Sequence, residues 1–212
     1  VKAGHVGPSK YDFTPKEMLR TPQYYFLLIT YTFANVAGLM IIAHASPIGQ
    51  QVAKLSALEA GSVVGILGIV NTFGRLFWGT VSDKIGRMRV VFIMYVISAI
   101  TMFSLNSLGT FWLYALGVAL IAFCFGGAMG TFPSIAADFY GPKYVSMNYG
   151  FIFLAYSVGG IVGPRLAAVI VESSNGSYQM AFIITGVLCS IGAVMALMAK
   201  APKSPMDMQK VS

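Results

Sequence analysis

Long apolar stretches separated by short polar connections dominate the chain. Six can be distinguished, each of about 18 to 25 residues, which is enough for an α-helix to cross the ~30 Å hydrocarbon core of a bilayer. They lack the alternation of apolar and polar residues that marks membrane-spanning β-strands. The pattern therefore predicts six transmembrane helices, over residues 24–44, 61–81, 88–105, 110–131, 147–171 and 179–199.

Polar segments flank this apolar region on both sides. Residues 1–23 are polar, contain proline and do not begin with methionine, which is typical of a loop inside a longer protein. Residues 200–212 form a second polar segment. We therefore divide the chain into a loop or linker (1–23), a six-helix transmembrane bundle (24–199) and a tail (200–212). We expect it to be a fragment of a longer protein or a natural half-length one.

Composition supports an all-α integral membrane protein. Only 10% of the residues are charged and 57% are hydrophobic, whereas soluble domains carry about 25% charged residues. Cys124 and Cys189 lie within predicted helices, and we interpret them as small buried apolar residues. The sequence has no metal-ligand spacing, phosphate-binding loop or hydrolase nucleophile motif. We therefore expect no metal, no cofactor and no enzymatic activity.

Lysine and arginine residues predict the orientation. The chain has 14 of them against 7 Asp and Glu residues. If the N-terminus is cytoplasmic, only Lys54 lies in an outer loop, Arg75 and Arg165 lie within helices, and the other eleven lie inside. This bias predicts both termini on the cytoplasmic side of the cell (inner) membrane. It also explains the net charge of +7 without a nucleic-acid partner, and we exclude that class.

Glycine pairs four residues apart predict close helix packing. Two such pairs lie in the fourth and fifth helices, where small residues allow backbones to approach closely. These pairs are Gly126 with Gly130 and Gly159 with Gly163. Pro164 follows the second pair directly, and Pro133 lies beyond the first. We expect both prolines to bend or break their helices.

The connection between the second and third helices carries a specific pattern. An acidic residue ends the helix, a glycine permits a tight turn, and cations face the headgroups. The residues of this pattern are Gly79, Asp83, Lys84, Gly86, Arg87 and Arg89. The spacing resembles the signature loop of the major facilitator superfamily, whose role there is that of a conformational switch.

This resemblance implies a fold and a partner. Members of that superfamily have twelve helices in two halves of six, and each half consists of two inverted three-helix repeats. The loop follows the second helix of a half, after a basic entry segment, so the chain resembles the C-terminal half. The G-x-x-x-G-P of the fifth helix also resembles a motif of antiporters. The implied partner is the N-terminal six-helix half of the same transporter.

A narrower resemblance concerns the substrate. Three runs are similar to the oxalate/formate antiporter family and its monocarboxylate-transporting relatives: Asn71–Leu76, Phe125–Gly127 with Phe132–Ser134, and Asn148–Gly150. The resemblance implies that Arg75 binds the substrate carboxylate. Tyr156 stands where the oxalate antiporter has a second cation, a lysine. A single cation favours a monocarboxylate such as lactate, pyruvate or formate over oxalate.

Arg75 is also a candidate on physical grounds. It lies about six residues, or roughly 9 Å, from the cytoplasmic end of its predicted helix. An arginine inside a membrane is costly and usually faces a polar cavity, where its guanidinium can bind a carboxylate with two hydrogen bonds. Asn71, one turn away, could bind the same ligand. The alternatives are extension to the membrane surface or a structural ion pair.

The remaining candidates are weaker. Tyr31 and Asn35 lie one turn apart in the first helix and could line the same cavity as Tyr156, or simply pack. His44, at the outer end of that helix, is a candidate proton site or an interfacial histidine without a role. No Asp or Glu lies deep in a predicted helix. Proton symport would therefore need a carboxylate in the other half, and anion exchange would not.

We thus expect secondary active transport of small carboxylate anions through the lipid bilayer by alternating access, as in an antiporter. Two alternatives stay open from the sequence. The chain could belong to a transporter of sugars, drugs or amino acids, since one fold carries many substrates. It could also be a membrane partner subunit that does not itself transport.

Overall fold

The computed structural model describes residues 11–203, and all regular elements of this part of the chain are helices. The parts of the predicted loop and tail before residue 11 and after residue 203 lie outside the described residues. The helices are α1 (Pro15–Leu19), α2 (Pro22–Val52), α3 (Ala57–Ile85), α4 (Arg87–Ser104), the short 3₁₀ helix η1 (Leu105–Ser107), α5 (Phe111–Tyr140), α6 (Val145–Ile152), α7 (Leu154–Ser173) and α8 (Gln179–Met198).

Six helical spans are long and apolar enough to cross a membrane, which confirms the six predicted helices. They are Pro22–Val52, Ala57–Ile85, Arg87–Ser107, Phe111–Tyr140, Val145–Ser173 and Gln179–Met198. Several extend beyond the apolar stretches because polar residues cap their ends. Ser56 and Glu59, for example, form a capping box that starts α3 four residues earlier than expected.

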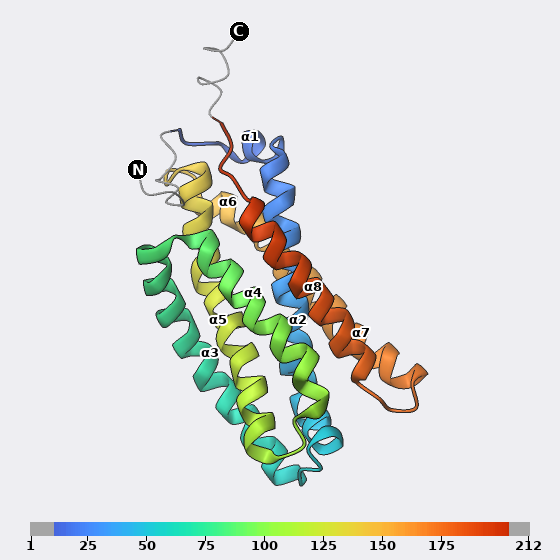
Figure 1. Cartoon of the computed structure of the whole chain (residues 1–212). Coiled ribbons are helices and arrows are strands. Elements are labelled where there is room, and N and C mark those ends of the chain that lie inside the picture. The colour runs from blue at the N-terminus through green and yellow to red at the C-terminus, as the bar shows by residue number, and fades with distance from the viewer. Residues whose placement is uncertain (1–10, 204–212) are drawn as a thin grey trace.

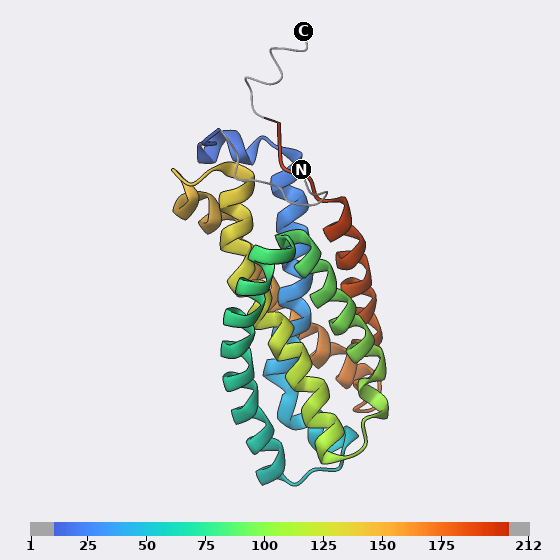
Figure 2. The same ribbon diagram turned by 60° about the vertical axis from the view of Figure 1, so that its left-hand side comes forward.

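The packing of the helices shows the expected pair of repeats. α2 packs mainly on α7, α3 on α5, and α4 on α8. We take α2–α4 as one repeat and α5–α8 as the other, and count α6 and α7 as a single span. Exchanging α2 with α5, α3 with α7 and α4 with α8 then gives the same three packing pairs. α2 and α5, the first helices of the two repeats, begin at opposite ends of the bundle (Figures 1 and 2). The repeats are therefore inverted, as in half of a twelve-helix major facilitator fold.

Glycines hold α5 directly against the backbone of α3. A Cβ atom on Gly126 would lie 2.0 Å from the carbonyl oxygen of Asn71, and one on Gly130 would lie 2.8 Å from the carbonyl oxygen of Arg75. Gly74 of α3 likewise has no room for a Cβ beside the carbonyl oxygen of Phe123. α3 and α5 thus touch at Asn71 and Arg75, the residues that the sequence predicts to bind an anion.

A second glycine contact joins α7 to α2. A Cβ on Gly159 would lie 2.4 Å from the Cβ of Asn35, and one on Gly163 would lie 2.6 Å from the carbonyl oxygen of Val36. Pro164 follows in the same stretch, yet α7 continues through it. Packing against a neighbouring helix can support a proline inside a membrane helix.

The predicted fifth helix is interrupted at Phe153 and not at Pro164, where we expected a bend or a break. α6 ends at Ile152 and α7 begins at Leu154. At this point the Tyr156 N–H bonds to the carbonyl of Phe153, three residues back. Such a tighter turn is one way to interrupt an α-helix. α5 also runs unbroken through Pro133.

The segment before α2 packs on one end of the bundle, which we call the terminal end because α2 begins there and α8 ends there (Figure 1). The Phe13 N–H donates to the carbonyl of Tyr140 at 2.8 Å, and the Asn148 side-chain amide donates to the carbonyl of Phe13 at 2.9 Å. Phe13 is buried. α1 lies in this segment, and hydrogen bonds from the backbone N–H and hydroxyl of Thr14 keep the pKa of Glu17 below its usual value.

Candidate functional site

Arg75 lies near the middle of α3, farther from the end of that helix than we expected. Because α3 continues to Ile85, Arg75 is ten residues from that end, about 15 Å at 1.5 Å per residue. We expected it about six residues from the end, because the last turn of α3 is polar and we interpreted that turn as part of a loop. The side chain lies on an exposed face of the helix.

The guanidinium of Arg75 has only weak partners. One of its nitrogens, Nη2, donates to the Asn71 Oδ1 at 3.3 Å and contacts the Met129 Sδ at 3.4 Å. Asn71 is held in turn, because its side-chain N–H donates to the carbonyl of Ala122 at 3.1 Å. In the part of the chain that the structure describes, both ion pairs involve Arg87 and neither involves Arg75.

Aromatic side chains from other helices complete this group. The ring of Tyr31 (α2) is fully buried and stacks on Phe132 with 3.9 Å between ring centroids. Its hydroxyl lies 3.4 Å from the hydroxyl of Tyr149 (α6). Phe132 lies one turn beyond Met129, which Arg75 contacts, and Tyr156 (α7) stacks on Phe153, whose ring centroid is 6.4 Å from that of Tyr31. We call Arg75, Asn71, Tyr31, Tyr149 and Tyr156 the Arg75 site.

Asn35 is placed differently from the other candidates. It is fully buried, and its side-chain amide donates to the carbonyl of Tyr31 at 2.7 Å. Its Cβ lies against Gly159 of α7. Its Oδ1 atom has no hydrogen-bond partner among the described residues. Asn35 therefore lies in the α2–α7 contact, behind Tyr31 rather than beside Arg75.

His44 connects three parts of the bundle at a distance from the Arg75 site along α2. Its Nε2 lies 3.1 Å from the carbonyl oxygen of Pro164, and its Nδ1 lies 3.0 Å from the hydroxyl of Tyr178. A carbonyl oxygen can only accept, so Nε2 carries a proton and a neutral ring accepts at Nδ1 from Tyr178. These contacts describe a cross-link between α2 and α7, and proton coupling by His44 stays a prediction.

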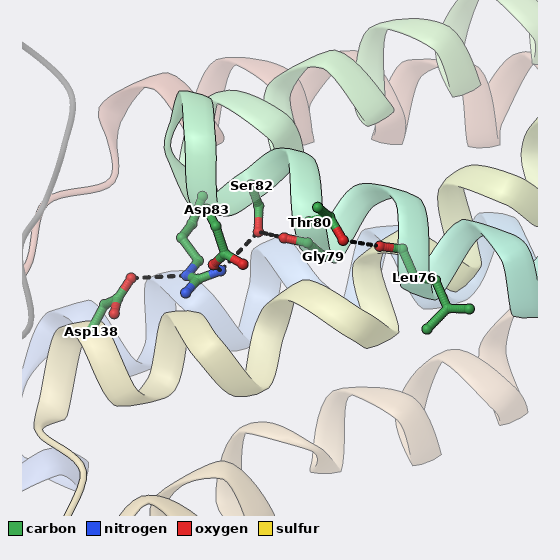
Figure 3. Close-up of polar contacts among 7 residues, drawn as sticks. Leu76, Gly79, Thr80, Ser82, Asp83 and Asp138 are labelled. Atoms are coloured by element: carbon green, nitrogen blue, oxygen red, sulfur yellow. Dashed lines mark hydrogen bonds and ion pairs between the residues drawn. The ribbon is translucent and has the colours of Figure 1, made fainter.

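The loop between α3 and α4 is organised by Arg87. Gly86 ends α3 with φ +101°, a conformation that suits glycine. Arg87 donates from Nη1 to Ser82 at 2.8 Å and pairs with Asp83 at 2.6 Å. Its Nε donates to Asp138, near the end of α5, at 3.0 Å. Figure 3 shows Asp83, Ser82 and Asp138 converging from α3 and α5. The loop thus joins α3 and α4 to α5.

The other residues of the motif lie around this cluster. Lys84 and Arg89 have exposed side chains. Gly79 has open space around it, because a Cβ atom there would meet nothing within 4 Å. The part of the chain that the structure describes does not explain why this position is glycine.

Removing the Asp138 carboxylate should destabilise the protein more than removing that of Asp83. The Arg87–Asp138 pair is mostly buried, with 23% and 19% of the two side chains exposed, whereas Asp83 is 61% exposed. We expect Asp138→Asn to cost about 1.5–3 kcal/mol of unfolding free energy, and Asp83→Asn about 0.5 kcal/mol. Denaturant unfolding of the full-length protein in detergent measures both.

Double-mutant cycles with Arg87→Gln provide the control for this comparison. The coupling energy of Arg87 with Asp138 should exceed its coupling with Asp83, because the first pair links two helices and is less solvated. Equal couplings for the two carboxylates would show that Arg87 does not join the loop to α5.

Asp138 and Tyr149 were not predicted to belong to these clusters, although the sequence contained an indication for each. Asp138 is an acidic residue at the end of a very apolar segment, on the same side of the membrane as the basic loop. Tyr149 lies in the Asn148–Gly150 run, which was quoted for its resemblance but given no role. The structure identified both through contacts between distant residues: Asp138 is 51 residues from its partner Arg87, and Tyr149 is 118 residues from its partner Tyr31.

The chemistry of the Arg75 site is that of an anion receptor. It offers one cation with several uncommitted N–H donors and a pair of hydroxyl groups. The carboxyl group of a ligand could accept hydrogen bonds from the guanidinium and from the one hydroxyl group that is not donating to the other. No group of three or more His, Cys, Asp or Glu side chains in residues 11–203 is placed to hold a metal ion.

The chain is similar in sequence to known membrane transporters. The chain is 38% identical over 152 residues to the uncharacterized MFS-type transporter YhjX of Escherichia coli, covering 71% of the chain and 38% of that protein. It is 34% identical over 191 residues to the oxalate:formate antiporter of Oxalobacter formigenes, covering 87% of the chain and 44% of that protein. Apicoplast pyruvate carrier 2 of Toxoplasma gondii is 37% identical over 107 residues, which are 50% of the chain and 15% of the carrier.

The chain thus spans less than half the length of each of these relatives. The family model of the Major Facilitator Superfamily matches residues 9–210, nearly the whole chain. The six membrane-spanning helices, their inverted repeats and this match agree with the resemblance found in the sequence. The chain is a multi-pass membrane protein that belongs to the major facilitator superfamily.

Proposed function

We propose that this chain is the C-terminal half of a transporter that carries small monocarboxylates, such as lactate, pyruvate or formate, by alternating access. The observation that carries the proposal is the position of Arg75 and the kind of hydrogen-bond partners it has. Its guanidinium lies near mid-helix on an exposed face, with an amide oxygen and a thioether as its hydrogen-bond partners. A charge held at such depth without an ion pair is costly unless it serves a ligand.

The number of cations supports a singly charged substrate. Arg75 is the single cationic member of the Arg75 site, and Tyr156 is a neutral residue. A dicarboxylate would bring a second negative charge with neutral hydroxyl groups as its partners in this half. The relatives include an oxalate:formate antiporter and a pyruvate carrier, whose substrates are small carboxylates. Exchange of one such anion for another is the mechanism that needs no titratable carboxylate in this half.

The partner of the bundle is the N-terminal six-helix half. α3 and α7 expose large apolar side chains on their outer faces, and Arg75 lies on such a face of α3. A second half covering these faces would close the Arg75 site from the other side. It would also use the open space at Gly79, where helices could approach closely. The exposed apolar residues of α3 and α7 include Ile69, Phe73, Leu76, Val158, Ile161 and Val169.

The terminal end of the bundle is assigned to the cytoplasm of a cell (inner) membrane. The loop cations Lys84, Arg87 and Arg89 lie there, beside the start of α2 and the end of α8, while Lys54 lies in the α2–α3 connection at the opposite end. This distribution follows the positive-inside rule. In this orientation the Arg87 cluster is on the cytoplasmic side, where its contacts between α3, α4 and α5 would form in one state of the transport cycle and loosen in the other.

A substrate panel on the full-length protein tests the proposal. Proteoliposomes loaded with unlabelled lactate should take up labelled lactate, and external pyruvate or formate should compete with it. Oxalate should compete less well, because it carries a second charge. Empty liposomes serve as the control. If lactate, pyruvate, formate and oxalate all leave transport unaffected while a sugar, drug or amino acid is carried, the carboxylate assignment is wrong.

A further inference from the structure

Tyr149 is the member of the Arg75 site without an assigned role. It lies on α6, a helix of eight residues that the interruption at Phe153 separates from α7. Its ring is partly buried, and its hydroxyl lies 3.4 Å from that of Tyr31. Tyr31 stacks in turn on Phe132, which lies one turn along α5 from Met129, and Arg75 contacts Met129 from α3. Tyr149 thus joins the Arg75 site through Tyr31.

One of the two hydroxyl protons takes no part in the hydrogen bond between Tyr31 and Tyr149. Each carries one O–H donor and can accept as well. In the Tyr31–Tyr149 contact one hydroxyl donates and the other accepts, and the structure gives neither a second hydrogen-bond partner among the described residues. At 3.4 Å the contact is longer than the usual 2.7–2.8 Å of such bonds. One O–H group next to the arginine is therefore uncommitted.

Burial indicates which hydroxyl that is. Tyr31 is fully buried, and its ring is fixed by stacking on Phe132. Tyr149 is less buried and lies on the accessible side of the pair. If Tyr31 donates to Tyr149, the Tyr149 proton is free to point toward a ligand at Arg75. Such a chain of hydrogen bonds strengthens its last donor.

The surroundings of α6 show what a ligand bond to Tyr149 would affect. Asn148, the preceding residue, is buried and donates to the carbonyl of Phe13 at the terminal end. Two consecutive residues of α6 therefore face the Arg75 site and the segment before α1. Phe153 lies between α6 and α7, where its N–H donates to the carbonyl of Tyr149 at 2.7 Å and its carbonyl accepts from the N–H of Tyr156 at 2.9 Å. A ligand that binds both Arg75 and Tyr149 would tie α6 to α3.

We propose that Tyr149 contacts the substrate: its hydroxyl donates a hydrogen bond to the carboxylate that Arg75 binds, and α6 is thereby the helix that responds to the anion. This inference rests on the proposed function, because it takes the ligand to be a monocarboxylate. It adds a specificity-determining residue that recognises the carboxylate from the side opposite α3.

Equilibrium binding of lactate to the purified full-length transporter tests the inference. Tyr149→Phe removes the hydroxyl alone and should weaken binding about tenfold or more, since a hydrogen bond to a charged group is lost. Tyr31→Phe should weaken it by a smaller factor, because Tyr31 acts through Tyr149. Tyr24→Phe is the matched control: its hydroxyl also joins α2 to α6, by donating to the carbonyl of Phe151 at 3.3 Å, without taking part in the Arg75 site.

A second readout separates substrate contact from a purely structural role. Lactate should slow hydrogen–deuterium exchange of α6 in the wild type and in Tyr24→Phe, and should not do so in Tyr149→Phe. Lactate affinity in Tyr149→Phe within twofold of the wild type, or an equal loss in Tyr24→Phe, would overturn the role of Tyr149 while the proposed function stands. A wild-type protein that binds no monocarboxylate would overturn both.

Discussion

Replacing Arg75 with alanine in the full-length protein should reduce monocarboxylate uptake at least about 100-fold, because losing one partner of a desolvated charge pair costs about 3 kcal/mol or more. Arg75 is the single cation of the Arg75 site and therefore its main attraction for an anion. The protein should still insert and fold, since Arg75 makes no ion pair within the described residues. Uptake of labelled lactate into proteoliposomes, with insertion checked by size-exclusion chromatography, measures the effect.

Two further variants define what the site needs. Arg75→Lys keeps the charge but not the planar guanidinium, and we expect less than about a tenth of wild-type uptake, because an ammonium group cannot bind a carboxylate through two parallel N–H donors. Arg165→Ala is the control, since Arg165 is also a membrane arginine and lies exposed on α7. Wild-type uptake by Arg75→Ala would eliminate this residue as the anion site.

Gly126→Ala should destabilise the bundle by about 3 kcal/mol, at the upper end of the usual cost of overpacking. The new methyl group would lie 2.0 Å from the carbonyl oxygen of Asn71, and that neighbour is backbone, which cannot rotate away. α3 and α5 would have to separate where Asn71 and Arg75 are held. We therefore expect reduced uptake together with a thermal unfolding midpoint lowered by several degrees.

Gly68→Ala is the matched control for this substitution. Gly68 lies on α3, two turns before Arg75, and a Cβ atom there would meet nothing within 4 Å. Alanine should be neutral at Gly68, or slightly stabilising because it favours helix. If both glycine variants unfold at the wild-type temperature, the α3–α5 contact is looser than the structure describes.

The sequence was sufficient for the architecture because hydrophobic length is a strong signal in membrane proteins. Apolar stretches separated by charged turns allowed all six spans to be predicted, and the motif from Gly79 to Arg89 indicated their family. The helix ends were less predictable. Polar residues such as Ser56 and Glu59 extend the start of α3 by capping it, and a polar last turn extends its other end to Ile85. Hydropathy registers neither, and the distance of Arg75 from Ile85 was underestimated because of that last turn.

The break at Phe153 was missed for a different physical reason. Proline is the usual local signal for a helix break, but here the helices run on through Pro133 and Pro164. The interruption lies at an aromatic residue that stacks on Tyr156 with 5.0 Å between ring centroids. No proline lies at this point of the sequence, so a rule based on proline could not locate the break. Tyr149 and Asp138 were missed because their partners are distant in sequence.

Part of the candidate site was predictable because ionisable and polar residues are rare inside apolar segments. Arg75 and Asn71 stood out in this way, and the structure places their side chains 3.3 Å apart. Asn35 shared their pattern along the sequence, but it faces α7. Spacing along one helix does not tell which neighbouring helix a face will meet.

The central claim is that a monocarboxylate binds at Arg75, and the most direct test is equilibrium binding of lactate to the purified full-length transporter and its Arg75→Ala variant. Isothermal titration calorimetry in detergent measures both proteins under the same conditions. Saturable binding to the wild type that disappears in Arg75→Ala is the predicted result. Binding of equal affinity in the two proteins, or none in the wild type, would contradict the claim.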